Sequence, residues 1–293
     1  MQTARKRPLT ADELEHYHRE GYVVPAFTLP PDELKLLQEL TLQTVAENEG
    51  NVDKPIRLPY IAQDPKDGPP PPGIFCRLNE HRSSRPDDWL RASAFPGVLD
   101  MVESVAGPDL VLWSGVLFHK RARQGPETPW HRDNGGSPPI RPLLSVNIWI
   151  AVFDADVSNG CMRVIPRSHL AADVGNEHYA DLRPNLSVNL TLRPDAFDER
   201  KAVDIELKAG QMLMFDFALV HGTNANTDSR VRSGYTVRYM PATSRFDHDA
   251  SGHWDANRAK DDDAYRTRPL FLVRGSDRAG NDFERGHPVH AYK

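Results

Sequence analysis

Residues 143–154, "LLSVNIWIAVFD", hold the pattern that decides the fold class. On an extended strand, residues two apart project from the same face. One face of this stretch is aliphatic and consists of Leu144, Val146, Ile148, Ile150 and Val152. The opposite face, too polar for a plain core, carries Ser145, Asn147 and Trp149. We predict a strand with one wall packed inward and the other lining a wet cavity, although a half-exposed sheet face has the same pattern.

Three more runs after residue 110 have the character of strands. They are rich in β-branched and aromatic residues and are separated by clusters of Gly, Pro, Asn and Asp: "LVLWSGVLFHKR" at 110–121, "AVDIELKAGQMLMFDFALVH" at 202–221 and "RVRSGYTVRYMP" at 230–241. This arrangement favours an all-β sandwich or barrel over alternating strand and helix units.

The chain before residue 110 carries helix signals instead. Thr10 and Glu13 have the spacing of a capping box, and Gly21 ends the segment that they begin. A second helix is expected from Pro31, and a third over residues 95–107.

Two segments read as loops. Residues 51–73 end in the proline run "KDGPPPPG", and residues 245–268 are strongly charged, which is typical of a solvated surface loop or a lid. After the second of these, "PLFLVR" at 269–274 predicts one further strand.

Composition excludes several classes of partner. The chain has 293 residues, of which 39% are hydrophobic and 26% charged, as is usual for a globular protein. The net charge of −5 gives no electrostatic reason to expect nucleic acid or a membrane surface. There is no apolar run of the roughly 20 residues that a membrane helix needs. The only cysteines, Cys76 and Cys161, lack metal-type spacing. We expect a cytoplasmic monomer or homodimer without a secretory signal.

The segment "PWHRDNGG" at 129–136 contains the first chemical signal. On a strand, His131 and Asp133 would project from the same face and could reach one metal ion, while Arg132 points away. A His-x-Asp triplet also arises often by chance, so on its own we interpret it as a surface polar pair.

His221 supplies a third candidate ligand, because it closes the apolar run that follows Gly210. Two imidazoles and one carboxylate form a facial triad that leaves coordination positions open, which suits a non-haem Fe(II) centre. Zinc could use the same ligands, so the triad alone leaves the metal open.

Arg232 lies on the next expected strand. One face of this strand carries Arg232, Gly234, Thr236 and Arg238. The other face, with Val231, Tyr235, Val237 and Tyr239, looks like core packing. An inward-facing arginine is costly unless an anion pairs with it. A bidentate carboxylate would satisfy it, whether from a bound molecule or from an Asp or Glu of the chain.

These residues resemble the phytanoyl-CoA dioxygenase (PhyH-like) family of Fe(II)/2-oxoglutarate-dependent oxygenases. The resemblance runs through "LTADELEHYHREGYVV" at 9–24, "PWHRDNGG", "SVNIWIAVFDADVSNGCMRVIPRSH" at 145–169 and "HGTNANTDSRVRS" at 221–233. It implies a mainly β fold with flanking helices around a double-stranded β-helix, or jelly roll. We expect a single domain over 1–293, with helical support over 1–109, the jelly roll over 110–241, and a charged loop or lid and C-terminal extension over 242–293.

The resemblance also implies roles for single residues. The positions that match iron ligands are His131, Asp133 and His221. The positions that match contacts to 2-oxoglutarate are Arg232, which grips its distal carboxylate, Thr223 and Trp149.

Other positions of the family pattern imply structural roles. Asn226 matches as a turn former, Ser168 and His169 match as structural residues, and Arg167 stands where the family usually has glycine. His119, on the strand before the triplet, could contribute a hydrogen bond or line the pocket.

The implied reaction consumes O2 and 2-oxoglutarate, releases succinate and CO2, and hydroxylates an unactivated C–H bond. Related halogenases carry a small residue where Asp133 stands, so the carboxylate argues for hydroxylation over halogenation, with desaturation and cyclisation as the alternative outcomes. Arg238 shares the face of Arg232, and Asn147 lies on the polar face of its strand. We predict that both contact the substrate. We expect this substrate to be a small polar molecule that bears a carboxylate or phosphonate, or a natural-product intermediate. Arg121, Arg123 and Arg141 are further candidates.

Two other classes of function are compatible with parts of the pattern. A non-catalytic jelly-roll protein could bind a metal or an organic acid, although the complete triad and Arg232 speak against a decayed site. A zinc hydrolase would need a general base, and the chain has no His-Glu-x-x-His motif.

Overall fold

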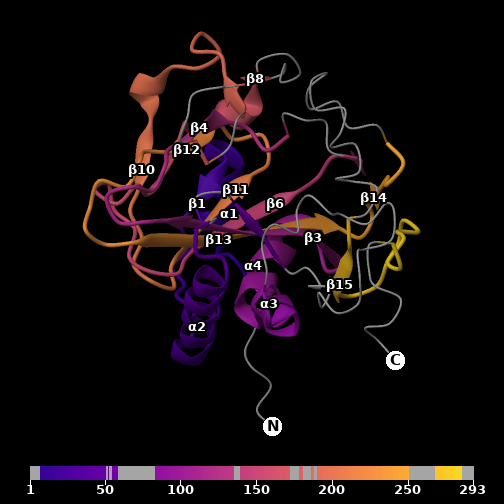
Figure 1. The fold of residues 1–293 in the computed structure, drawn as a ribbon. Helices are drawn as coiled ribbons and strands as arrows, with labels where there is room; N and C mark the ends of the chain where they lie inside the picture. Colours follow the sequence, from indigo (N-terminus) through magenta and orange to yellow (C-terminus); the bar gives the residue numbers. More distant parts are fainter. Residues whose placement is uncertain are drawn as a thin grey trace.

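The computed structural model describes residues 7–50, 52, 55–58, 83–134, 139–171, 178–180, 186–187, 190–250 and 268–285. Within them, two main antiparallel sheets form the double-stranded β-helix that the sequence predicts (Figure 1). The predicted fold class, mainly β with flanking helices, is therefore confirmed.

The larger sheet has seven strands. In spatial order they are β1 (Tyr22–Val23), β11 (Met212–Asp216), β6 (Val146–Ala151), β13 (Arg232–Pro241), β3 (Leu110–Lys120) and β15 (Phe271–Arg274), and β2 (Ile56–Arg57) also pairs with β3. Strands β6 and β13 are central and are paired on both sides. Because helices cover one face and the smaller sheet covers the other, nearly every side chain on these two strands is buried.

The smaller sheet has four strands and carries half of the site described below. Its order is β10 (Val203–Ile205), β7 (Met162–Val164), β12 (His221–Thr223) and β4 (Thr128–His131). Two short pairs accompany it, namely β14 (Arg245–Phe246) with β5 (Ile140–Arg141) and β8 (His178–Ala180) with β9 (Leu190–Leu192).

Three helices lie where the sequence predicts them: α1 (Ala11–Glu20), α2 (Pro31–Glu47) and α4 (Pro96–Ala106). The capping box is present, since the Thr10 hydroxyl accepts a hydrogen bond from the Glu13 amide at 3.2 Å. The Glu13 carboxylate in turn accepts one from the Thr10 amide at 2.8 Å. Gly21 ends α1 at φ 84°, in the left-handed region that glycine tolerates best.

A fourth helix, α3 (Pro86–Ala92), was not predicted. It has seven residues, too few for a helical period to emerge from the sequence. Tertiary contacts hold it in place instead. The Trp89 side chain is fully buried, and its indole N–H donates to the Thr44 hydroxyl of α2 at 3.1 Å.

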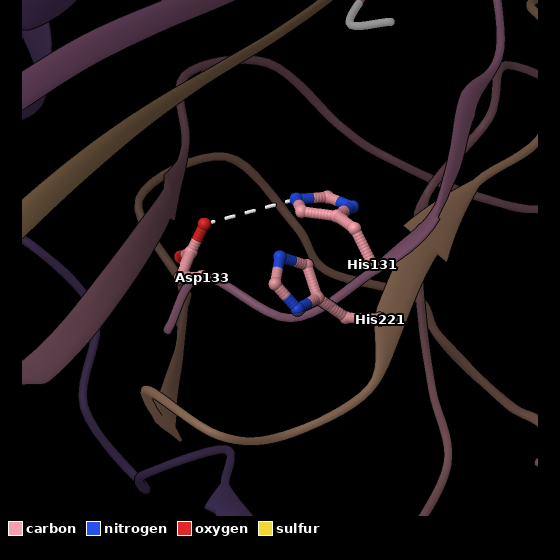
Figure 2. A group of neighbouring side chains, drawn as sticks. All are labelled: His131, Asp133 and His221. Carbon is pink, nitrogen blue, oxygen red and sulfur yellow. Dashed lines mark ion pairs between the residues drawn. The ribbon is translucent and has the colours of Figure 1, made fainter. Parts of the chain in front are cut away.

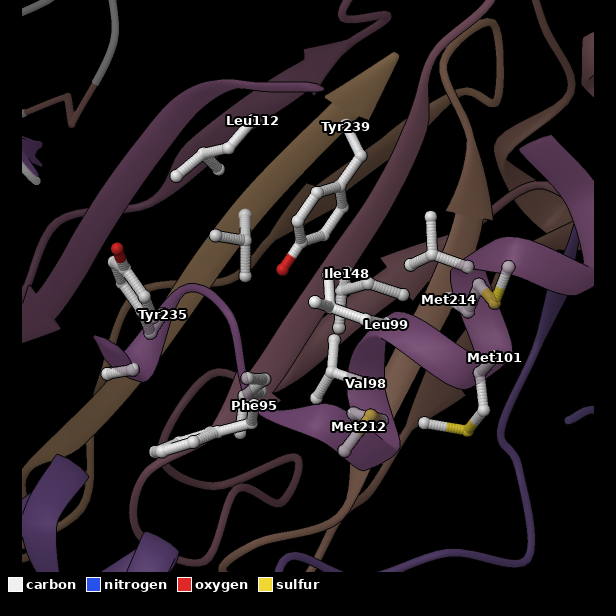
Figure 3. Packing of buried hydrophobic residues seen from close by; sticks show 14 of the residues in the cluster. Phe95, Val98, Leu99, Met101, Leu112, Ile148, Met212, Met214, Tyr235 and Tyr239 are labelled. Atoms are coloured by element: carbon white, nitrogen blue, oxygen red, sulfur yellow. The ribbon is translucent and has the colours of Figure 1, made fainter. Parts of the chain in front are cut away.

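The main core lies between the helices and the outer face of the larger sheet. Ile148 of β6 and Met214 of β11 pack there with Val98 and Leu99 of α4 (Figure 3). Val146, Ile150 and Val152 belong to the same cluster, so the predicted aliphatic face is confirmed for these positions. Leu144 is the exception: β6 begins only at Val146, and Leu144 is 53% exposed.

The predicted loops are partly replaced by strands. Ile56 and Arg57 form β2, which pairs with Leu117 and Val116 of β3, so the loop prediction was wrong there. Arg245 and Phe246 of the charged segment form β14, which pairs with β5, so the loop prediction was wrong there too. Most of the remainder of 51–73, and residues 251–267 of the charged segment, lie outside the described residues. The strand predicted within 269–274 is present as β15.

Strands from the whole length of the chain join the larger sheet, since β1 and β2 precede residue 110 and β15 follows residue 241. The division into a helical support, a jelly roll and a C-terminal extension stays a prediction. Among the described helices, none combines the length and apolar character that a membrane span requires.

Candidate active site

Two histidines face each other across neighbouring strands of the smaller sheet. In the register of β12 with β4, His221 is the direct partner of His131, and their ring centroids are 4.2 Å apart. Asp133 follows β4 by two residues and places Oδ1 3.7 Å from His131 Nε2 (Figure 2). One ligand atom from each of the three side chains lies within 4.8 Å of the others. The structure thus brings together the three residues predicted as metal ligands.

Main-chain carbonyls fix the orientation of both imidazoles. His131 Nδ1 lies 2.8 Å from the Pro129 carbonyl, and His221 Nδ1 lies 2.9 Å from the Leu219 carbonyl. A carbonyl oxygen only accepts, so Nδ1 is the protonated nitrogen in each ring. Nε2 then presents its lone pair, as in metal sites where the other ring nitrogen donates to a carbonyl. This donor set fits a divalent cation.

The protonation states also suit a metal. Burial, followed by the nearby His221, lowers the pKa of His131 to about 4, so its ring is neutral at physiological pH. Burial opposes ionisation of Asp133, but the Arg238 cation and then the two imidazoles hold the pKa of this carboxyl below its ordinary value. Neutral imidazole and ionised carboxylate are the forms that bind metals.

Arg232 is the second main feature of the site. Its side chain is buried, and Nε donates to the Gly160 carbonyl at 2.8 Å. Within the described part of the chain, Nη2 has no hydrogen-bond partner. Burial lowers the pKa of this guanidinium to about 9, which is still above neutral pH, so it remains a cation. A buried, charged donor of this kind fits the carboxylate of a bound molecule.

The predicted division of β13 into two faces is confirmed within the strand but was wrong for Val231, which precedes β13 and is 37% exposed. Tyr235, Val237 and Tyr239 belong to the main core. Arg232, Thr236 and Arg238 line a cavity between the sheets, together with both histidines, Trp149 and Thr223. The Arg232 guanidinium lies 5.3 Å from the Trp149 ring, and the Thr223 hydroxyl accepts from the Thr128 amide at 3.3 Å.

Sequence reasoning missed several residues that also line this cavity: Phe118, Thr128, Met162, Phe215 and Gly222. Phe118 stands opposite Gly234 in the pairing of β3 with β13. Cross-strand partners share a face of the sheet. Phe118 could therefore have been found from the sequence only if the register had been known.

Lys120 was also missed. It pairs with Arg232 across the β3–β13 ladder and is buried, with its amine donating to the Pro126 carbonyl and, at 2.7 Å, to the Asn224 carbonyl. Burial, and then the charge of Arg232, lowers the pKa of Lys120 to about 6. A second basic group, Lys120, therefore lies on the strand next to Arg232.

The two predicted substrate residues both contact Asp133. The Asn147 amide donates to Asp133 Oδ2 at 2.6 Å, and Arg238 forms an ion pair with the same carboxylate at 3.0 Å. Arg238 also lines the cavity, so a substrate contact there stays a prediction. The other candidates, Arg121, Arg123 and Arg141, are exposed and do not line the described cavity.

The remaining motif residues have structural contacts. The Asn226 side chain accepts from the Asp228 amide and donates to the Arg230 carbonyl, as expected for a turn former. Arg167 adopts φ 65°, in the left-handed region that glycine tolerates best, although this position carries a side chain. His119 Nδ1 pairs with the Ser233 hydroxyl at 2.8 Å.

The contacts of Ser168 and His169 tie the turn after β7 to its surroundings. The Ser168 hydroxyl accepts from the Val220 amide, next to His221, and His169 Nε2 lies 3.1 Å from the His18 carbonyl. The Ser168 carbonyl also accepts from Arg132, which is buried away from the cavity. The predicted orientation of Arg132 is thus confirmed.

Gly234 leaves the space that Trp149 occupies. A Cβ at this glycine would lie 2.0 Å from two atoms of the indole ring. We expect Gly234→Ala to lower the free energy of unfolding by about 3 kcal/mol, the upper part of the range for overpacking, because both central strands would have to shift. Urea unfolding measures the loss. In Gly50→Ala the added methyl group meets nothing within 4 Å, so the cost is limited to the strain of alanine at φ 92°. This variant should therefore lose less, and equal losses would contradict this account.

The chain belongs to the phytanoyl-CoA dioxygenase (PhyH) family, whose family model matches residues 6–234. This membership confirms the resemblance inferred from the sequence motifs. The family is one of dioxygenases, and the fold and triad described above are consistent with it.

Individual relatives are distant. A Caenorhabditis elegans phytanoyl-CoA dioxygenase domain-containing protein 1 homolog is 30% identical over 99 residues, which span 32% of this chain and only 33% of that relative. The ectoine dioxygenase of Sphingopyxis alaskensis is 22% identical over 299 aligned residues, which cover 95% of this chain and 87% of that dioxygenase. The structure of CytC3 with Fe(II) and alpha-ketoglutarate has 18% identity and a TM-score of 0.62, covering 94% of this chain and 92% of CytC3. It therefore shares the fold.

Proposed function

We propose that the protein is an Fe(II)- and 2-oxoglutarate-dependent dioxygenase that hydroxylates an unactivated C–H bond of a small polar metabolite or natural-product intermediate. Succinate and CO2 are the co-products. The observation that carries the proposal is the pairing of a buried two-histidine, one-carboxylate cluster with a buried arginine whose Nη2 lacks a partner among the described residues.

In this proposal His131, Asp133 and His221 hold the iron. Three protein ligands of nitrogen and oxygen type leave open positions, the arrangement used by oxygen-handling non-haem iron centres. The bound iron would supply the activation of O2 and the oxidative decarboxylation of 2-oxoglutarate. CytC3, which has this fold, has been solved with Fe(II) and alpha-ketoglutarate, in agreement with this assignment.

The residues at the other end of the cavity bind 2-oxoglutarate. Arg232 takes its distal carboxylate, because a planar guanidinium matches a carboxylate in charge and geometry. The Thr223 hydroxyl lies beside it, and the indole of Trp149 forms a wall that keeps the guanidinium in place. The chain thus contributes orientation and a cavity screened from water, while metal and cosubstrate carry the difficult step.

A small polar substrate agrees with the mixed lining of the cavity. Thr236 and Arg238 offer polar atoms near the metal ligands, and Phe118 and Met162 offer apolar surface. Arg238, the one of the two predicted substrate residues that lines this cavity, would contact a carboxylate or phosphonate of such a substrate.

The alternative is a jelly-roll protein that binds a metal and an organic acid without turnover. Anaerobic addition of Fe(II) and then 2-oxoglutarate should produce a weak visible charge-transfer band. A screen for succinate release should then identify a substrate class among amino acids, phosphonates, osmolytes and acyl thioesters. A band without stimulated succinate release would favour the binding protein. If no band forms although iron binds, the proposed cosubstrate site is wrong.

A further inference from the structure

The carboxylate of Asp133 is held by two strands of the opposite sheet. The Asn147 amide donates to Oδ2 at 2.6 Å. Arg238 Nε donates to Oδ2 at 3.2 Å, and Nη2 lies 3.0 Å from both Oδ1 and Oδ2. The side chains of Asp133 and Arg238 are only 10% and 11% exposed. This is a buried, charge-assisted clamp on a residue that points at the two histidines.

The two carboxylate oxygens are not equivalent in this clamp. Each oxygen of an ionised carboxyl group has about two lone-pair directions. Asn147 and Arg238 together occupy those of Oδ2. Among the described residues, Oδ1 accepts only from Nη2, and it is the oxygen that faces His131 Nε2 at 3.7 Å. Oδ1 therefore keeps one lone pair directed toward the histidines.

A hydrogen-bond chain sets the orientation of the Asn147 amide. The Trp113 indole donates to the Ser145 hydroxyl at 3.0 Å, and this hydroxyl donates a long, 3.5 Å bond to Asn147 Oδ1. With the amide oxygen turned toward Ser145, the amide nitrogen is left for Asp133. The clamp is thus supported from behind by buried groups.

The backbone places both members of the clamp side by side. Arg238 and Asn147 are direct partners in the pairing of β13 with β6, at the centre of the larger sheet. Asp133 instead follows β4 of the smaller sheet, on a turn outside the regular ladder. Without a contact from the larger sheet, no strand pairing would fix this carboxylate, whereas both histidines lie within strands.

We propose that Arg238 and Asn147 are positioning residues that hold Asp133 so that it binds the metal through Oδ1 alone. The inference rests on the proposed function, since it concerns the same metal. If Asp133 binds in this way, it takes only one coordination position of the metal. A single carboxylate oxygen and two imidazoles leave room for the two donor atoms of 2-oxoglutarate and for O2, whereas a chelating carboxylate would take one of these places.

This role differs from a substrate contact in what it predicts. A group that positions a metal ligand affects metal binding before any cosubstrate or substrate is present. A group that only contacts substrate changes the substrate KM and leaves metal binding unaltered. Titration of the metal-free protein with Co(II), without 2-oxoglutarate, therefore separates the two roles through the Kd and the visible absorption of the bound ion.

Asn147→Ala is the sharpest variant, because it removes a contact to Oδ2 without changing any charge. We expect its Co(II) Kd to rise about 10-fold, the lower end of the cost usually seen when a hydrogen-bond partner of a metal ligand is lost. Arg238→Met should weaken Co(II) at least as much, and both variants should show an altered Co(II) absorption spectrum. Arg238→Lys keeps the charge but not the planar fork, so it should recover only part of the affinity.

Matched controls exclude a general loss of structure. Asn48→Ala removes a buried asparagine that bonds to the Thr44 carbonyl at the end of α2, and Arg274→Met breaks a peripheral ion pair to Asp100 and Glu103. Both should keep the wild-type Kd, and circular dichroism should confirm folding of every variant.

The outcomes separate the two levels of inference. If the wild-type protein fails to bind Co(II), the proposed function is wrong. If it binds, but Asn147→Ala and Arg238→Lys match its Kd within twofold and its spectrum, the positioning role is wrong. That result, together with a raised substrate KM, would instead indicate that both residues contact the substrate.

Discussion

Replacement of His131 by alanine is expected to abolish 2-oxoglutarate turnover and the charge-transfer band that Fe(II) and 2-oxoglutarate should produce in the wild-type protein. The variant would keep only Asp133 and His221, and no other described histidine, cysteine or carboxylate completes a three-ligand group at this place. Its metal affinity should fall by more than the roughly 100-fold that loss of a ligand's hydrogen-bond partner can cost. Anaerobic titration with Fe(II) and an assay for succinate measure the two effects.

His169→Ala is the matched control for this prediction. His169 belongs to a neighbouring turn, where its Nε2 lies 3.1 Å from the His18 carbonyl, and it does not line the cavity. The control should keep both the band and the turnover. Retention of metal-dependent succinate release by His131→Ala would remove this residue from the iron site.

The second large effect concerns Arg232→Met. We expect the affinity for 2-oxoglutarate to fall at least about 100-fold, because each hydrogen bond to a charged group contributes roughly 1.5–3 kcal/mol and a bidentate pair provides two. Binding of Fe(II) alone should not change, since Arg232 does not contact the three ligands. Isothermal titration with 2-oxoglutarate in the presence of metal measures the first quantity, and anaerobic titration with Fe(II) alone measures the second.

The same variant should not lose stability in the absence of 2-oxoglutarate. Burial of an unpaired cation is costly, and methionine removes that cost. A ligand that binds only the folded state raises the Tm, so 2-oxoglutarate with a redox-inert metal should stabilise the wild-type protein and have little effect on Arg232→Met. Arg230→Met is the control, because Arg230 is an exposed residue paired with Asp156 and Asp228. Equal stabilisation of Arg232→Met and wild type would contradict the assigned role.

The sequence predicted the features that depend on local periodicity. The alternation along β6 and β13 separated core-facing from cavity-facing side chains, because the side chains of a strand alternate between its two faces. The capping box at Thr10 located α1, because the threonine side chain accepts a hydrogen bond from a backbone N–H of the first turn. The proline at the start of α2 located that helix, because proline lacks the N–H that would have no partner at this position.

Features that depend on strand register and tertiary contact could not be predicted from the sequence. The short elements β2 and α3 owe their structure to pairing with β3 and to the burial of Trp89, not to a pattern of their own. The contacts of Asn147 and Arg238 with Asp133 follow from the pairing of β6 with β13 and from a turn of the other sheet. Periodicity placed both residues on the correct faces but could not name their partner.

The main-chain carbonyls that orient His131 and His221 allow the chain to vary the shape of its cavity at little cost to the metal. Each ring is tied through Nδ1 to the carbonyl of the residue two positions before it in its own segment, so these two hydrogen bonds do not involve Phe118 or Met162. Both residues can therefore change in size while these hydrogen bonds persist. Substitutions at these two positions should yield proteins that accept other substrates and still bind iron. Phe118 and Met162 are therefore the positions at which to change the substrate range.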